Sequence, residues 1–370
     1  MSGRPTSSRP GGNGSKRGAG QGGGRGGGQG GGRSGGHGAN HDHSAGRSRA
    51  TDQGGGPGPG AGQGGGAPVF RSGFACLVGR PNAGKSTLTN ALVGEKVAIT
   101  SSRPQTTRHT VRGIVHREDA QLVLVDTPGL HRPRTLLGQR LNDLVRDTLL
   151  EVDVIGFCMP ADERVGPGDR FIASQLAQVR RGGRGTPVVV VVTKADTVDR
   201  ARLTEHLLAV SELIEADDVV PTSAVDGFQV DVLADVLVGH LPPGQPLYLD
   251  GELTDEPEQV MIAELVREAA LEGVRDELPH SLAVVVDEIE PRENRPVDAP
   301  LLDVRVLLYV ERESQRGIVI GKGGERLRDV GTRARQEIQA LLGQRIHLDL
   351  RVKVAKDWQR DPKQLRRLGF

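Results

Sequence analysis

The chain alternates between runs of consecutive apolar residues and stretches in which apolar residues recur every three or four positions. Five short apolar runs are expected to form strands, at 74–78, 122–125, 153–159, 188–192 and 218–222. Between them, the stretches 86–93, 170–180 and 230–241 have helical spacing. Strands that are apolar throughout and separated by helices are typical of a mostly parallel sheet covered on both faces. The sequence therefore predicts an α/β domain over residues 69–242.

A second order of elements follows a Pro- and Gly-rich acidic linker, expected at residues 243–257. The pattern predicts a helix at 258–274, strands at 281–290 and 301–311, a glycine turn at 321–324, a helix at 327–342 and a strand at 347–355. The apolar run that ends at Ile320 is strand-like by itself, whereas the order of elements favours a helix–glycine turn–helix unit. Residues 258–370 are thus expected to form a small α+β domain.

Composition sets the first 68 residues apart from both domains. The first 66 residues contain 28 of the 53 glycines in the chain, together with Ser, Gln and Arg. Such a segment cannot bury enough apolar surface to offset its ordering entropy, so residues 1–68 are expected to be a disordered extension. It is either a solubilising tail or a non-specific RNA tether, and the absence of aromatic residues among its arginines disfavours the tether.

Charge is unevenly distributed, although the formal net charge is only +1. The first 66 residues have eight Lys and Arg against two acidic residues, residues 67–282 have 22 against 31, and residues 283–370 have 18 against 14. Two basic ends around an acidic middle suggest that the ends meet a polyanion.

The two cysteines, Cys76 and Cys158, lie in apolar runs, which favours buried free thiols in a reducing cytosol. No run approaches the roughly 18 apolar residues of a membrane span, so any membrane association is expected to be peripheral. The expected location is therefore the cytoplasm.

A nucleotide-binding loop is expected at residues 79–86, GRPNAGKS. The segment matches G-x-x-x-x-G-K-[ST], follows a predicted strand and opens a predicted helix, which is the context that the motif requires. The glycines let the backbone wrap a phosphate, Lys85 neutralises phosphate oxygens, and Ser86 is placed to bind Mg²⁺ at the helix N-terminus. A structural glycine turn is the weaker interpretation because it does not require the Lys-Ser pair.

Two further stretches indicate which nucleotide is bound. The segment LVLVDTPG places Asp126 for the metal and the Gly129 N–H for a γ-phosphate. The segment VVVVVTKAD ends an apolar strand with Asp196, which can accept two hydrogen bonds from guanine, while the Lys194 stem can cover the base. Ser223 and the Ala224 N–H are candidates for the guanine O6. We therefore expect GTP rather than ATP.

Residues 97–113 contain Thr106 and Thr107, in the place where a switch loop completes the magnesium shell. One of the two hydroxyls is expected to bind the metal only when a γ-phosphate is present, and Thr107 is favoured.

Leu130 stands where a Gln could have oriented water, so slow intrinsic hydrolysis is expected. Asn82 is a candidate for holding a monovalent cation or for a hydrogen bond within the loop. His131 is interpreted as a solvent-facing loop residue rather than a catalyst.

The turn Gly321-Lys322-Gly323-Gly324 lacks the Lys-Ser/Thr pair of a nucleotide loop and is followed by a basic helix. Side chains at such a turn would block the approach of a nucleic-acid backbone, and the following helix N-terminus attracts phosphate. Positive charge is expected from Lys322, Arg326, Arg328, Arg333 and Arg335. The turn is thus predicted to hold single-stranded RNA, with a solvated charged helix–helix turn as the alternative. Trp358, in the basic tail, is expected to pack against the domain rather than to stack on a base.

The motifs GRPNAGKST, QTTRH, DTPGL, TKAD, SAV and VIGKGG, in this order and spacing over residues 70–370, resemble the Era-type GTPases. The resemblance implies a Ras-like P-loop GTPase domain followed by a type II KH domain. It also implies GTP/GDP and Mg²⁺ as ligands and a slow GTP-hydrolysing switch. Thr193 departs from the family pattern, which usually has Asn there, and weaker base affinity is expected.

The resemblance further implies binding to the 3′ region of small-subunit (16S-type) ribosomal RNA on the pre-small ribosomal subunit. The expected roles are rRNA processing and small-subunit assembly, with a link to cell-cycle control. A monomer is expected, with peripheral attachment to the inner face of the cytoplasmic membrane. Two alternatives stay open: a GTPase that regulates a protein or membrane partner with RNA binding secondary, and an RNA-binding module whose GTPase fold has no useful turnover.

The predicted site residues fall into four groups. Lys85, Thr107 and Gly129 are the expected catalytic residues, and Ser86, Thr107 and Asp126 the expected magnesium ligands. The RNA site comprises Gly321, Lys322, Gly323, Gly324, Arg326 and Arg328. The nucleotide site comprises Gly79, Arg80, Pro81, Asn82, Ala83, Gly84, Lys85, Ser86, Thr87, Asp126, Thr127, Pro128, Gly129, Leu130, Thr193, Lys194, Ala195, Asp196, Ser223 and Ala224.

Overall fold

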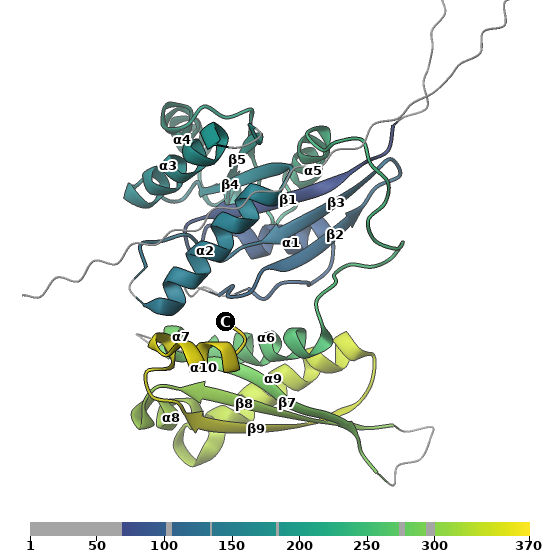
Figure 1. The fold of residues 1–370 in the computed structure, drawn as a ribbon, viewed down its shortest axis with the longest axis vertical. Coiled ribbons are helices and arrows are strands. Elements are labelled where there is room, and N and C mark those ends of the chain that lie inside the picture. The colour runs from purple at the N-terminus through teal and green to yellow at the C-terminus, as the bar shows by residue number, and fades with distance from the viewer. Residues whose placement is uncertain (1–68, 101–105, 134, 183–184, 274–277, 294–299) are drawn as a thin grey trace, which may run out of the picture. The chain divides into compact units, whose positions relative to one another are not determined.

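The computed structural model describes residues 69–370, apart from 101–105, 134, 183–184, 274–277 and 294–299. The extension expected over 1–68 lies outside the described residues. Figure 1 shows the fold, and its labels are used below.

The first domain is built on a six-stranded sheet with the order β2-β3-β1-β4-β5-β6. All neighbouring strands are parallel except β2 and β3, which are antiparallel. The central position of β1 places the loop that follows it at the carboxyl edge of the sheet, where α/β folds bind ligands. The strands are β1 (Arg71–Gly79), β2 (Val111–His116), β3 (Ala120–Asp126), β4 (Val154–Pro160), β5 (Val188–Thr193) and β6 (Asp218–Pro221).

Helices cover both faces of this sheet (Figure 1). Side chains alternate between the two faces along each strand. Ala75 and Leu77 of β1 pack with α1 (Lys85–Val93) and α5 (Val230–Gly239). Cys76 and Val78 pack with the opposite layer, which comprises α2 (Leu136–Glu151), α3 (Pro167–Gly182) and α4 (Arg200–Leu213). Because both faces are covered, the strands must be apolar throughout, which explains the continuous runs in the sequence.

The apolar runs predict the five parallel strands, but β2, α2 and α4 of this domain have no counterpart among the predictions. Strand β2 is short, carries the exposed Arg112 and pairs antiparallel at the edge, so it lacks a continuous apolar run. Helix α2 has a buried stripe of Leu137, Leu141, Val145 and Leu149 at four-residue spacing, a signal that was present in the sequence. Helix α4 buries only His206 and Val210 fully, so its stripe is weak.

The second domain has a three-stranded sheet with the order β7-β8-β9, in which β7 and β8 are antiparallel and β8 and β9 parallel. Its core lies between one face of the sheet and two helices, α6 and α9. The apolar run before the glycine turn is the end of a helix, as the order of elements predicts, and not a strand. The elements are α6 (Glu258–Leu271), α7 (Leu278–Ser281), β7 (Ala283–Pro291), β8 (Leu302–Val310), α8 (Glu313–Ile320), η2 (Lys322–Gly324), α9 (Glu325–Leu342), β9 (Ile346–Val354), η3 (Trp358–Arg360) and α10 (Pro362–Arg367).

Two further segments are held by specific contacts. The stretch between α5 and α6 bonds along the first sheet: Leu247 and Tyr248 donate their N–H groups to the Gln121 side chain at 2.6 and 2.9 Å. Trp358 is fully buried and donates its ring N–H to the Ser281 carbonyl at 2.9 Å. Trp358 therefore packs within the protein, as expected. The predicted architecture, an α/β domain with a mostly parallel sheet followed by a small α+β domain, is confirmed.

Candidate functional site

The loop between β1 and α1 has the geometry of a phosphate cradle. A Cβ atom on Gly79 would lie 2.6 Å from the Cys158 carbonyl oxygen, so only glycine fits where the loop leaves the sheet. Gly84 adopts φ 84° at the N-cap of α1 and provides no side-chain cap. The N–H groups of the first helical turn therefore keep their capacity to bind an anion.

Lys85 is buried beneath this loop. Its ammonium lies 3.2 Å from the Arg80 carbonyl oxygen and 3.5 Å from that of Gly79. Burial lowers the pKa of Lys85, and the charge of Asp126 opposes that shift. A buried ammonium with two backbone acceptors and one carboxylate nearby is well placed to neutralise phosphate oxygens.

The three predicted magnesium ligands converge on one point. The Ser86 hydroxyl is 2.6 Å from Asp126 Oδ2 and 2.9 Å from the Thr107 hydroxyl, which is itself 3.2 Å from Asp126 Oδ2. Asp126 is fully buried, and its Oδ1 atom has no hydrogen-bond partner among the described residues. Burial raises the pKa of Asp126, while Lys85 and the two hydroxyls lower it. Three hard oxygen donors with one unpaired carboxylate oxygen fit a Mg²⁺ ion.

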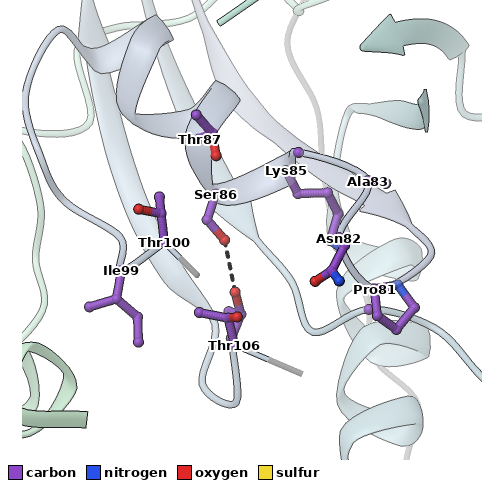
Figure 2. Close-up of a pocket in the computed structure, with 12 residues that line it drawn as sticks. Pro81, Asn82, Ala83, Lys85, Ser86, Thr87, Ile99, Thr100 and Thr106 are labelled. Carbon is purple, nitrogen blue, oxygen red and sulfur yellow. Dashed lines mark hydrogen bonds between the residues drawn. The ribbon is translucent and has the colours of Figure 1, made fainter. Parts of the chain in front are cut away.

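Figure 2 shows the pocket in front of the loop, which is lined by residues from the P-loop, α1, the switch segment and the loop after β3. Gly129 packs so tightly that a Cβ atom there would lie 2.7 Å from the Pro81 nitrogen. Ile99 and Thr100 also line the pocket, although no motif in the sequence singles them out. The pocket therefore covers the phosphate and magnesium end of the predicted nucleotide site.

The predicted base-binding residues lie beside the P-loop at the ends of β5 and β6. The Thr193 hydroxyl donates to the Ala83 carbonyl at 2.7 Å, so Thr193 braces the P-loop. Lys194 adopts φ 55° and pairs with Asp162 at 3.1 Å, and Asp196 is exposed. The Ala195 N–H bonds the Thr222 carbonyl at 3.1 Å, which ties this loop to the segment containing Ser223.

The Arg80 side chain lies against α3. Its Nε atom is 2.8 Å from Oδ1 of the buried Asp169, and its Nη1 atom is 2.9 Å from Glu163. A Cβ atom on Gly168 would lie 2.6 Å from Arg80 Cδ, so the arginine stem occupies that space. This brace involves residues 89 positions apart, and no motif could have predicted it.

The residues after Gly129 contain no evident general base. Leu130 is buried, and its N–H bonds the Gly79 carbonyl at 3.1 Å. The His131 carbonyl accepts a hydrogen bond of 2.7 Å from Asn142, and the residue is half-buried. Asn82 lines the pocket with φ 64°, and its proposed contact with a monovalent cation stays a prediction.

The glycine turn of the second domain is open on one side. Gly323 and Gly324 have φ angles of 61° and 77°, and a Cβ atom on either would meet nothing within 4 Å. Gly321 is different, because a Cβ atom there would lie 2.7 Å from Arg326 Cβ. The open side lets a nucleic-acid backbone approach closely, as a KH turn requires.

A groove continues from this turn between α9 and β9. Its lining includes Gly324, Arg328 and Arg335, together with His347 and Leu348 of β9, which sequence reasoning did not select. Lys322 and Arg328 have no ion-pair partner in the described part of the chain. Arg326 and Arg333 instead contact the end of α6, and Arg333 pairs there with Glu272.

The comparisons with known proteins agree with both halves of the site. A family model described as "50S ribosome-binding GTPase" matches residues 74–194, and a KH domain model matches residues 277–359. The chain is 68% identical over 307 residues to the GTPase Era of Streptomyces coelicolor, covering 82% of this chain and 96% of that protein. It is 69% identical over 302 residues to the GTPase Era of Mycolicibacterium paratuberculosis, covering 81% and 99%. The chain belongs to the Era family of GTPases.

Two solved Era structures are also similar to it. One is Era in complex with MgGDPNP and nucleotides 1506–1542 of 16S ribosomal RNA, with a TM-score of 0.77 and 36% identity over 81% of this chain and 99% of that one. The other is an Aquifex aeolicus Era variant bound to GDP and aluminium fluoride, with a TM-score of 0.76, 36% identity and the same coverage.

Family membership confirms that this Era chain is a GTPase, which hydrolyses GTP to GDP and phosphate. The predicted recognition and enzyme class are therefore correct. The individual site residues remain predictions that the geometry now makes concrete. Thr193, the departure from the usual Asn, still bonds the P-loop through its hydroxyl, so one function of an Asn amide is retained.

Proposed function

We propose that this Era GTPase is a nucleotide-controlled switch that binds the 3′ region of small-subunit ribosomal RNA during rRNA processing and small-subunit assembly. Two findings support the RNA target. The glycine turn and the groove beside it present an open backbone and two basic side chains, Lys322 and Arg328, with no ion-pair partner among the described residues. The Era structure at 36% identity contains a 16S RNA segment.

The observation that carries the switch proposal is a set of contacts between the switch segment and α6. The described residues of both domains belong to one compact unit, Gly64–Phe370. The Thr100 N–H bonds the Glu268 carboxylate at 2.9 Å, and the Thr106 carbonyl accepts a hydrogen bond from Arg267. Two adjacent residues of α6 thus hold the switch segment on either side of residues 101–105.

Arg108 makes the next contact. It is buried, donates to the Leu282 carbonyl at 2.6 Å, and has its guanidinium 5.7 Å from the Trp358 ring centre. Burial lowers the pKa of Arg108, and the nearby Arg267 lowers it further, while Glu264 opposes both. Thr107, the proposed magnesium ligand, therefore lies between two residues that contact the KH domain. Movement of Thr107 would disturb contacts on both sides of it.

These contacts support a sequence of events on the chain's own residues. With GTP bound, Ser86, Thr107 and Asp126 would hold Mg²⁺, which neutralises phosphate charge. Lys85 and the Gly129 N–H would contact the γ-phosphate. Once that phosphate leaves, Thr107 would lose the magnesium contact that holds it beside Ser86. Thr106 and Arg108 could then release α6 and the Trp358 cluster. RNA affinity would then follow nucleotide state.

A charge reversal at the turn tests the proposal. Replacing Lys322 and Gly323 together with Asp should abolish retention of a 16S 3′-end oligonucleotide while GTP hydrolysis stays at the wild-type rate. A scrambled oligonucleotide of equal length controls for non-specific binding. Undiminished retention by the double variant would contradict the RNA role and favour a GTPase that acts on a protein or membrane partner.

We further propose a monomer in the cytoplasm with peripheral contact to the inner face of the cytoplasmic membrane. Resemblance to the family is the support for this proposal. In the described part of the chain, no helix has the length and apolarity to cross a membrane. Flotation with anionic vesicles, run beside light scattering of the free protein, tests both points; a protein that stays at the bottom of the gradient would contradict the membrane contact.

A further inference from the structure

The last turn of α6 makes contacts in two directions. Toward the GTPase domain, Arg267 and Glu268 bind Thr106 and Thr100. Toward the glycine turn of residues 321–324, the Arg326 guanidinium donates to the Glu272 carbonyl at 2.7 Å and to the Ala270 carbonyl at 3.2 Å. A single helical turn thus separates the switch contacts from the contacts of Arg326.

Arg326 also packs directly against the glycine turn. Its Cβ atom would lie 2.7 Å, and its backbone nitrogen 3.0 Å, from a Cβ atom at Gly321. Gly321 therefore packs closely against Arg326, so a shift of Arg326 would displace the first glycine of the turn. Since Arg326 is the second residue of α9, it also sets where the N-terminus of that helix points.

The electrostatics favour Arg326 at the end of α6. The last carbonyl groups of a helix have no partner within it and carry the negative end of the helix dipole, which a cation stabilises. Arg333 pairs with Glu272 at the same place, so two arginines of α9 hold the end of α6. Arg328, two residues further along α9, instead lines the groove.

We propose that Arg326 is a positioning residue that connects the switch-binding turn of α6 to the RNA-binding glycine turn, and is not itself an RNA ligand. The inference rests on the proposed RNA switch and names the side chain that transmits it. When the switch segment releases Arg267 and Glu268, the end of α6 keeps the Lys96–Glu268 ion pair but loses these two contacts with the first domain, so it can shift. Arg326 would then carry that shift to Gly321 and to the start of α9.

The test compares Arg326→Ala with Arg328→Ala on the same helix. For each protein, the Kd for a 16S 3′-end oligonucleotide is measured with GDP and with GDPNP across a salt series. In Arg326→Ala, the ratio of the two Kd values should fall toward one, with an unchanged slope of log Kd against log salt. In Arg328→Ala, the ratio should stay at the wild-type value, and the slope should drop by about 0.7, as expected for one lost phosphate contact on a single strand.

Arg326→Lys keeps the positive charge without the planar guanidinium, so it serves as a second variant should Arg326→Ala fold poorly. It should keep the wild-type salt slope and lose part of the nucleotide dependence. The inference would be overturned, and the proposed function would stand, if both Arg326 variants kept the wild-type ratio of the Kd values with GDP and GDPNP. A reduced slope of log Kd against log salt with that ratio unchanged would have the same consequence. Equal Kd values with GDP and GDPNP in the wild-type protein would overturn both.

Discussion

At the residue scale, the P-loop motif was readable from the sequence, but the residues that fix its shape were not. Gly79, Lys85 and Ser86 follow from spacing alone, because a phosphate cradle demands those residue types in that order. Arg80 belongs to the same motif, yet its side chain pairs with Asp169 and Glu163. Its carbonyl oxygen, in turn, accepts from Lys85. Such long-range partners depend on how the elements pack, which spacing does not encode.

Replacing Arg80 with Ala should therefore reduce kcat for GTP hydrolysis about tenfold, because small displacements of catalytic groups are costly. It should also lower the free energy of unfolding by about 2 kcal/mol, since Asp169 would lose its cationic partner, although the partial exposure of Arg80 moderates the loss. Single-turnover phosphate release and urea unfolding measure the two effects. Asp235→Ala, which removes the exposed pair with Arg117, is the matched control and should change neither. A wild-type kcat in Arg80→Ala would refute the positioning role.

Thr193 gives a second prediction at this scale. Thr193→Val keeps the side-chain shape but removes the hydroxyl that bonds the Ala83 carbonyl. Loss of this buried bond should weaken GDP binding about fivefold, in line with about 1 kcal/mol for a hydrogen bond. Thr193→Asn should instead strengthen it. Calorimetric titration with GDP measures both, and a pair of variants indistinguishable from wild type would rule out the brace.

At the scale of elements, continuous apolar runs located the parallel strands well, because a sheet covered on both faces leaves its strands no polar positions. The same reasoning does not predict β2, which has one exposed position and lies at the edge of the sheet. Helix α6 was found from its pattern, but its buried Glu264 and Arg267 were not recognised as a pair. Arg267 Nε lies 2.9 Å from Glu264 Oε1, three residues away on one helix face.

This pair predicts a pH dependence of stability. Burial alone would raise the pKa of Glu264, but the charge and hydrogen bonds of Arg267 outweigh burial and leave it lowered. A carboxylate with a lowered folded-state pKa stabilises the fold above its unfolded pKa and loses that contribution as pH falls through the folded value. Glu264→Gln should thus cost about 2 kcal/mol at pH 7 and progressively less below about pH 4.5. Urea titrations of both proteins from pH 7 to pH 3 measure the difference, and a constant difference across that range would contradict the assignment.

At the scale of the whole molecule, the sequence indicated two domains of different charge and element order, and it suggested a ligand for each. It could not show that Arg267 and Glu268 of the second domain hold both sides of the switch segment. Nothing in the spacing of Thr100, Thr106 and α6 links residues more than 160 positions apart. The switch mechanism therefore rests on packing that only the three-dimensional arrangement reveals.

Reciprocity between the two ligands tests this mechanism most directly. If the switch segment and the glycine turn share α6, nucleotide and RNA must change each other's affinity by the same factor, typically about fivefold or more. The measurement is the Kd of GDPNP with and without a saturating 16S 3′-end oligonucleotide, set beside the Kd of that oligonucleotide with GDPNP and without nucleotide. Two equal factors, each well above one, are expected. A GDPNP affinity that RNA leaves unchanged would show that the two sites do not communicate.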